Sequence, residues 1–392
     1  MDREEVKARL IQGLEACRQE LIDLSLRIHD NPELGFQEIK ASTWLAEYLE
    51  GNGFAVERGI CQLATAFRGS YGSGRPAIAL LAEYDALPQM GHGCGHNIIA
   101  ASAAAAGVAA KAAVDRFGGS ILVIGTPAEE LYGGKALMVA RHAFDGVDVA
   151  MMVHPATRDA VITQTLACAN LEVEFFGKEA HAAARPAEGI NALEAMILAF
   201  NGINSLRQHI REKARIHGII TDGGQAANIV PAHSAGTFLV RAQDEAYLDE
   251  LGRRVINCFE AASLASGARL EYRWRQIHYA ALRTNLALAQ VFTENMEALG
   301  RQVEPLDPNR GFGSTDMGNV STVVPSIHPM VAIAPAGLSS HSPEFAAAAA
   351  SETGHRGLLD AAKALAMSVV DLLARPEIMA KVQEEFAQAQ PD

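Results

Sequence analysis

The chain has 392 residues, of which 49% are hydrophobic and 20% charged, and its formal net charge is -13 at pH 7. This length favours two domains, and the composition is that of a globular protein with enough apolar side chains for a core. The negative charge argues against general binding to nucleic acids or anionic membranes, because both need basic patches.

Three features indicate a cytoplasmic protein. The first five residues are mostly charged and no apolar signal-peptide stretch follows them. No run of about 18 apolar residues is apparent, so we expect no transmembrane helix. The cysteines are five, an odd number, and scattered, which suits a reducing compartment better than a disulfide framework.

Helical spacing of apolar residues predicts a long amphipathic helix over 3–29, ended by Asn31-Pro32-Glu33, and a second helix over 39–49. Short runs of apolar residues without alternation then follow at 78–82, 121–124, 147–153 and 331–333. Such runs are typical of strands buried on both faces. An Ala-rich segment, 98–113, predicts a closely packed helix between the first two. Alternating strands and helices indicate an α/β domain with a central, mostly parallel sheet flanked by helices.

The middle of the chain has a different pattern. Residues 171–175 and 237–242 alternate between apolar and polar, as half-exposed antiparallel strands do, and helical segments are predicted at 192–210 and 246–263. We therefore expect a smaller α+β domain at 167–280, inserted between the two parts, 1–166 and 281–392, of the larger domain.

Metal-competent side chains follow each of the predicted buried strands. They are Cys94 and His96 after the first, Glu130 after the second, His154 at the end of the third and His341 after the fourth. Open α/β sheets bind ligands at the carboxyl ends of their strands. Thiolate, imidazole and carboxylate groups are zinc ligands, and carboxylate-rich sets also suit manganese. Five ligands exceed the needs of one tetrahedral ion, so we expect two divalent ions about 3.5–4 Å apart.

A carboxylate beside these ligands is the candidate general base. Glu129 is adjacent to Glu130 in the chain, and a metal-bound water needs a base to accept its proton. Each residue also has an ordinary interpretation: Cys94 as a buried thiol in a turn, the two glutamates as a solvated pair, and the histidines as isolated core or surface residues. The convergence of four segments on one sheet edge favours the metal site. Ser340 and Ser342 near His341 suggest a serine hydrolase instead, but no G-x-S-x-G motif is present.

These residues resemble the motifs of the M20 family of metallopeptidases, in its aminoacylase and amidohydrolase branch. The most specific stretch is EYDALPQMGHGCGHN at 83–97, and the resemblance extends to PAEE at 127–130, HP at 154–155 and HSP at 341–343. The segment GSTDMG at 313–318 resembles the sub-branch of M20-domain-containing protein 2 dipeptidases and p-aminobenzoyl-glutamate hydrolase subunits.

The resemblance implies a role for each ligand. Cys94 would bridge two metal ions, His96 and His154 would complete one ion, and Glu130 and His341 would complete the other. Glu129 would be the general base, and Asp85 would orient a ligand by a hydrogen bond.

The resemblance also implies that the inserted domain is a lid and dimerisation domain. In GKEAHA at 177–182, His181 matches a histidine that reaches the active site of the partner subunit. Asn228 and Arg241 match residues that hold the substrate. A homodimer is therefore expected. The chain departs from the wider family at Glu83, where a histidine is common, and the resemblance leaves zinc versus manganese open.

The expected activity is hydrolysis of an amide bond in a small N-acyl amino acid or dipeptide with a free carboxylate. A metal-bound hydroxide would attack the carbonyl, with Glu129 as the base and with His181 and Asn228 helping the metals to stabilise the oxyanion. One alternative is the amide of p-aminobenzoyl-glutamate. Another is a non-catalytic module that binds amino acids or peptides, although such a module has no need of a base at position 129.

Overall fold

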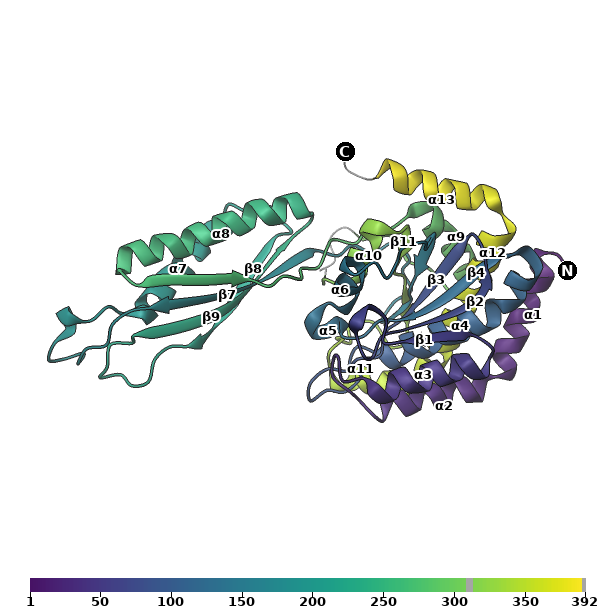
Figure 1. The fold of residues 1–392 in the computed structure, drawn as a ribbon, viewed down its shortest axis with the longest axis horizontal. Helices are drawn as coiled ribbons and strands as arrows, with labels where there is room; N and C mark the ends of the chain where they lie inside the picture. Colours follow the sequence, from purple (N-terminus) through teal and green to yellow (C-terminus); the bar gives the residue numbers. More distant parts are fainter. Residues whose placement is uncertain (308–312, 390–392) are drawn as a thin grey trace. The chain divides into compact units, whose positions relative to one another are not determined.

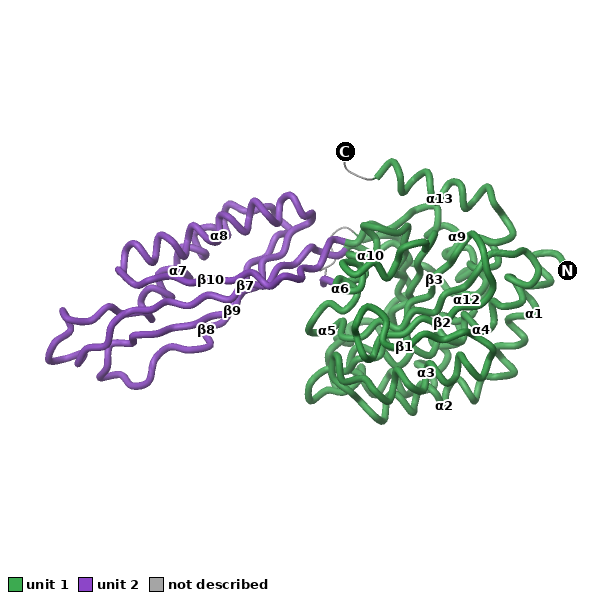
Figure 2. The backbone as a smooth tube through the Cα atoms, viewed as in Figure 1, with its two compact units in different colours: residues 1–164, 282–311, 316–392 green, residues 165–281, 312–315 purple. Residues whose placement is uncertain are grey.

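The computed structural model describes residues 1–307 and 313–389, which divide into two compact units (Figure 2). Unit 1 contains residues 1–164, 282–307 and 316–389, and unit 2 contains residues 165–281 and 313–315. The sequence pattern placed 313–315 in the larger domain. In the structure they group with unit 2, where the backbone N–H of Leu166 donates to the carbonyl of Gly313 at 3.0 Å.

Unit 1 is built on a six-stranded sheet with the order β1-β2-β4-β3-β5-β11 (Figure 1). β2 runs antiparallel to β1 and β4, whereas β4, β3, β5 and β11 are mutually parallel. A mostly parallel sheet was predicted, and this prediction is confirmed. The strands are β1 (Ala55–Arg58), β2 (Phe67–Ser73), β3 (Ala77–Ala82), β4 (Gly119–Gly125), β5 (Val149–Met151) and β11 (Ser326–Ile327).

The central strands lack alternation because both faces of the sheet are buried. In β3, Ile78 and Leu80 belong to one apolar cluster, and Ala79 and Leu81 belong to another on the opposite face. Several helices contribute to the first cluster: α1 (Arg3–Ala16), α2 (Arg18–His29), α3 (Ile39–Gly51), α4 (His96–Phe117), α9 (Leu286–Ala298), α12 (Glu352–Ala374) and α13 (Pro376–Gln388). The second cluster includes residues of α6 (Gly134–Ala140) and α10 (Met317–Val323).

Helix α4 contains a window of 18 residues that is long and apolar enough to cross a membrane. The Ala-rich segment 98–113 predicted a closely packed helix here, and no transmembrane helix was expected. Helix α4 packs against β3, β4 and α12, and 78% of that window is buried inside the protein. Burial on this scale is that of a core helix, whose small alanine side chains allow the close approach of its neighbours.

Two elements differ from their predictions. The long helix expected over 3–29 is interrupted at Cys17, whose φ of -93° and ψ of 9° separate α1 from α2. The fourth apolar run forms β12 (Met330–Ala332), which pairs in parallel with β6 (His154–Ala156) in a separate two-stranded sheet. The central sheet is instead completed by the short strand β11, which has too few residues to produce a pattern.

Unit 2 is a four-stranded antiparallel sheet with the order β10-β7-β9-β8, packed against two helices. Its core includes Phe175 and Phe238 from the sheet and Met196 and Phe259 from the helices. The elements are β7 (Ala167–Phe176), α7 (Ala192–Arg207), β8 (Arg215–Asp222), β9 (His233–Ala242), α8 (Glu245–Ser266) and β10 (Arg269–Trp274).

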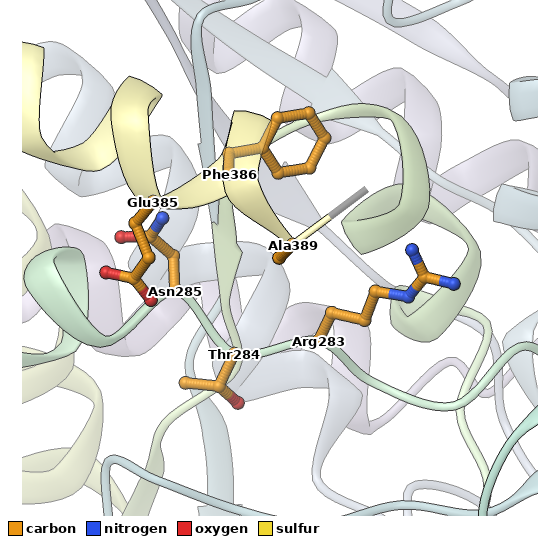
Figure 3. Close-up of a pocket in the computed structure, with 6 residues that line it drawn as sticks. All are labelled: Arg283, Thr284, Asn285, Glu385, Phe386 and Ala389. Atoms are coloured by element: carbon orange, nitrogen blue, oxygen red, sulfur yellow. The ribbon is translucent and has the colours of Figure 1, made fainter. Parts of the chain in front are cut away.

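A small cavity of about 40 Å³ in unit 1 lies where α13 meets the start of α9 (Figure 3). Glu385 accepts the backbone N–H groups of Leu286 and Ala287, at 2.6 and 2.8 Å. Asn285 caps the same helix and donates to the carbonyl of Val382 at 2.9 Å. These bonds satisfy the free N–H groups of α9 and tie α13 to it, so the polar groups of this cavity have a structural role.

Candidate metal centre

The five predicted metal ligands lie in unit 1, at or after the carboxyl ends of strands. Cys94 is on the segment between β3 and α4, and His96 is the first residue of α4. Glu130 is in the short helix α5 (Glu129–Tyr132) that follows β4. His154 is the first residue of β6, just after β5, and His341 precedes α11 (Pro343–Ala349).

The structure brings these side chains into two groups that share one thiol. The ligand atoms of Cys94, His96 and His154 lie within 4.8 Å of one another, as do those of Cys94, Glu130 and His341. The division is the one that the family resemblance implies. Their function as metal ligands stays a prediction.

His154 presents one ring nitrogen to Cys94. Its Nδ1 lies 2.7 Å from the carbonyl oxygen of Pro155, and its Nε2 lies 3.3 Å from the Cys94 sulfur. Because Nδ1–H donates to the carbonyl, Nε2 keeps its lone pair. Burial, together with the nearby His96, lowers the pKa of His154 to about 4. A neutral imidazole with a free Nε2 is the form that binds a metal ion.

Asp85 connects the two groups. One of its carboxylate oxygens lies 3.0 Å from His96 Nδ1, and the other accepts the backbone N–H of Glu130 at 3.0 Å. Burial opposes the charged form of His96, but Asp85, Cys94 and Glu83 together raise its pKa well above the usual value. Asp85 thus directs His96 Nε2 toward the shared thiol and fixes the turn that carries Glu130.

Within the described part of the chain, two of the predicted ligand atoms are buried without a hydrogen-bond partner, as expected for atoms that bind a cation. Among the described residues, neither His96 Nε2 nor Glu130 Oε1 has a hydrogen-bond partner, although both atoms are buried. Buried polar atoms without partners are costly, and a metal ion would satisfy both. Burial raises the pKa of the Cys94 thiol, and a coordinating cation would reverse this by stabilising the thiolate.

Tight backbone turns position the ligand loops. Gly95, between Cys94 and His96, has a φ of 79°, and a Cβ there would lie 2.5 Å from a Pro155 side-chain carbon. Ala128, just before the two glutamates, adopts a left-handed conformation with a φ of 61°. His341 also has a positive φ, 61°, and its N–H donates to the carbonyl of Gly93 at 2.9 Å, which brings it beside the Cys94 loop.

Glu129 lies next to both groups. Its carboxylate is within 4.8 Å of ligand atoms of His96 and Glu130. Burial raises the pKa of this carboxyl group well above its usual value, and the nearby carboxylates of Glu83, Asp316 and Glu130 add to the effect. A cation bound at the centre would act in the opposite direction. The position is suitable for a group that exchanges protons with a reacting water.

The predicted substrate residues lie in unit 2. His181 and Asn228 are exposed and lie on paired segments, because Ala182 N–H donates to the Asn228 carbonyl at 3.0 Å. Arg241, near the end of β9, donates to the hydroxyl of Ser314 at 2.7 Å. Within this unit the structure does not bring Arg241 together with His181.

Sequence reasoning missed a buried charged group beside the ligands. Lys135 donates to Glu83, and it also donates to Asp316 at 3.0 Å. From the sequence, Glu83 was identified only as a departure from the family pattern and Asp316 only as part of the GSTDMG segment, and no ion pair was predicted for either residue. The one sign of this group in the sequence was a lysine directly after Gly133-Gly134. Lys135 and Asp316 are 181 residues apart, so no local pattern connects them.

The sequence is similar to characterised hydrolases over almost its whole length. The model of the peptidase family M20/M25/M40 matches residues 79–364. The Xaa-Arg dipeptidase of Mus musculus is 36% identical, with 97% of this chain and 92% of the mouse protein covered. One of the subunits of the p-aminobenzoyl-glutamate hydrolase of Escherichia coli strain K12 is 30% identical, with 96% of this chain and 94% of the E. coli protein covered.

Solved structures show the same fold. A Bacillus subtilis protein described as a dinuclear metal binding peptidase of the M20 family superposes with a TM-score of 0.72 at 20% identity, covering 92% of this chain and 99% of that one. An aminobenzoyl-glutamate utilization protein from Klebsiella pneumoniae gives a TM-score of 0.69 at 21% identity, covering 90% and 98%. The chain belongs to the peptidase family M20/M25/M40, and it is a hydrolase.

Proposed function

We propose that this M20/M25/M40 hydrolase uses two divalent ions, zinc or manganese, to cleave an amide bond in a dipeptide or small N-acyl amino acid with a free carboxylate. The observation that carries the proposal is the Cys94 thiol shared by two ligand groups, with Glu129 beside both. The similarity to the mouse Xaa-Arg dipeptidase supports a dipeptide substrate.

The chain's own groups account for the proton transfers. When bound, the ions supply Lewis acidity and lower the pKa of a water molecule. Cys94, His96 and His154 would hold one ion, and Cys94, Glu130 and His341 the other. Glu129 accepts the proton of the attacking water and returns it to the leaving amine. Asp85 keeps His96 and the Glu130 turn in place during both transfers.

A second candidate substrate is an amide of the p-aminobenzoyl-glutamate type. The identity of 30% to the E. coli hydrolase over 96% of this chain favours it specifically. Both candidates release an amino acid with a free carboxylate, so the same metal centre and base serve either reaction.

The geometry of unit 2 supports a homodimer with a shared site. His181 pairs with Ile229, which precedes the first residue of β9, whereas Arg241 is near the end of that strand. Arg241 is eight positions after His233, which in a strand is a distance of about 27 Å, far more than a dipeptide spans. If Arg241 and His181 both contact one substrate, they come from different subunits. The edge strand β8 exposes two isoleucines, Ile219 (65%) and Ile220 (40%), which supports such an assembly.

A substrate screen tests the proposal. The protein is stripped of metal, reconstituted separately with Zn²⁺, Mn²⁺ and Co²⁺, and assayed with Xaa-Arg and neutral dipeptides, N-acyl amino acids and p-aminobenzoyl-glutamate. We expect the highest kcat/KM with a dipeptide. Highest activity on p-aminobenzoyl-glutamate would select the second candidate. No hydrolysis by protein that carries two ions per chain would contradict both.

A further inference from the structure

Behind the candidate metal centre lies a fully buried group of charges that the proposed reaction does not use. The ammonium of Lys135 donates to Glu83 and, at 3.0 Å, to Asp316. Lys135 and Asp316 have no exposed surface, and Glu83 is 1% exposed. Burying such a group costs free energy of desolvation. The proposed reaction gives these three residues no role that would explain this cost.

Asp316 binds both the main chain and the side chain of Lys135. The Lys135 backbone N–H donates to the second carboxylate oxygen of Asp316 at 2.7 Å. The preceding residue, Gly134, has no room for a side chain, because a Cβ there would lie 1.7 Å from the carbonyl oxygen of Pro127. Lys135 is therefore fixed directly to the turn that carries Glu129 and Glu130.

Glu83 faces the metal centre with its other oxygen. That oxygen lies 3.5 Å from His96 Nε2, the nitrogen expected to bind a metal ion. The carboxylates of Glu83, Glu129 and Asp316 also lie within 4.8 Å of one another, an arrangement that would itself suit a cation. The structure places the Lys135 ammonium against two of these three carboxylates.

We propose that Lys135 is a positioning residue, which holds Glu83 and Asp316 away from the bound metal ions and leaves Glu129 as the carboxylate that meets the reacting water. The inference rests on the proposed function. Without Lys135, the Glu83 carboxylate loses the ion pair that holds its other oxygen, so the oxygen that lies 3.5 Å from His96 Nε2 is free to move closer and to enter the metal coordination. The two unbalanced carboxylates would also displace Glu129 by repulsion.

The variant Lys135→Met removes the ammonium but keeps a side chain of similar length. In Co²⁺-loaded protein we expect a changed visible absorption spectrum, because the spectrum reports the ligands and geometry of the ion. We expect kcat to fall about 10²-fold or more, the scale of losing a correctly placed base, with KM changed less than threefold. The double variant Lys135→Met/Glu83→Gln removes the carboxylate that would intrude, so it should regain the wild-type spectrum and at least tenfold of the lost kcat.

A buried lysine outside the site provides the control. Lys7 in α1 donates to Asp371 at 2.7 Å and to Asn295 at 2.8 Å, and is 9% exposed. Lys7→Met should lower the melting temperature while leaving the Co²⁺ spectrum and kcat unchanged. A folded Lys135→Met variant that behaves in the same way would show that Lys135 is merely structural and would overturn the proposal.

Two further outcomes are decisive. If Lys135→Met does not fold, the double variant is compared with Glu83→Gln alone; we expect matching spectra and kcat values within tenfold, and a double variant more than 10²-fold slower would overturn the proposal. If the wild type cleaves no substrate in the screen, the proposed function fails. The Co²⁺ spectra need no substrate, and they still decide whether Lys135 controls the coordination.

Discussion

Glu129 and Glu130 are adjacent residues for which we predict different tasks. Glu130 joins Cys94 and His341 in one ligand group, and its backbone is held by Asp85. Glu129 lies beside the ligands and close to two further carboxylates. We predict that Glu129→Gln keeps both metal ions and loses roughly 10²-fold or more in kcat, the range for removal of a general base. Elemental analysis and steady-state kinetics on the same sample measure the two effects.

The matched variant is Glu130→Gln, which we expect to lose metal. If Glu129→Gln loses metal and Glu130→Gln keeps it, the two roles have been assigned in the wrong order.

Arg241 is predicted to bind the free carboxylate of the substrate. Its guanidinium already donates to the Ser314 hydroxyl, and a planar guanidinium can bind a carboxylate through two hydrogen bonds. Arg241→Ala should raise KM tenfold or more, because a bond to a charged group contributes about 1.5–3 kcal/mol. The comparison uses a substrate whose carboxylate is masked as an amide. Equal hydrolysis of masked and free substrate by the wild type would assign Arg241 a structural role only.

At the scale of elements, the start of α3 braces the turn that carries the two glutamates. Glu38, which has no exposed surface, accepts the backbone N–H of Ala128 at 2.8 Å and the hydroxyl of Thr65 at 2.9 Å. Burial raises its pKa from 4.5 to about 7, against the effect of these hydrogen bonds. The folded state therefore binds the Glu38 proton more tightly than the unfolded state does.

This shift predicts a pH dependence of stability. A raised carboxyl pKa stabilises the fold fully below pH 4.5, and the contribution is lost as the pH rises through about 7. The loss is roughly 3 kcal/mol at most, from 1.36 kcal/mol per pKa unit. In metal-free protein, Glu38→Gln should lose less free energy of unfolding than the wild type between about pH 5 and pH 8, as measured by urea titration. The same pH dependence in both proteins would contradict the assignment.

The elements that were predictable from sequence are those whose burial leaves a pattern. β3, β4 and β5 are buried on both faces, and their apolar runs identified them. β1 is mostly exposed and β11 has two residues, so neither carries a signal. The register of β12 with β6 depends on contacts between residues 330 and 154, which no local pattern encodes.

The candidate site divides in the same way. The proposed ligands have distinctive residue types next to recognisable strands, which allowed all five to be named. Lys135, Glu83 and Glu38 carry no such signal, because a charged side chain reads as exposed in sequence and its burial depends on partners such as Asp316 and Thr65. Asp85 is the exception, because the family resemblance assigned it to orient a ligand, and the structure places it 3.0 Å from His96 Nδ1. The other buried charges that support the site were the part that sequence could not supply.

At the scale of the whole molecule, the predicted homodimer has a direct test by complementation. His181→Ala and Glu129→Ala should each be inactive as homodimers. After subunit exchange, a shared site pairs an intact His181 from one chain with an intact Glu129 from the other, so part of the activity should return. Recovery is assayed after mixing, with heterodimers verified by mass spectrometry. Heterodimers without activity would place His181 in the site of its own chain or outside catalysis.

The central claim is that one thiol, Cys94, serves two metal ions. The most direct measurement is the number of Zn²⁺ or Mn²⁺ ions bound per chain and their affinities, by titration of metal-free wild type, Cys94→Ala and His341→Ala. We predict two ions in the wild type, weakened binding of both in Cys94→Ala, and weakened binding of one in His341→Ala, since only Cys94 belongs to both ligand groups. Two ions bound by Cys94→Ala with wild-type affinity would contradict the account.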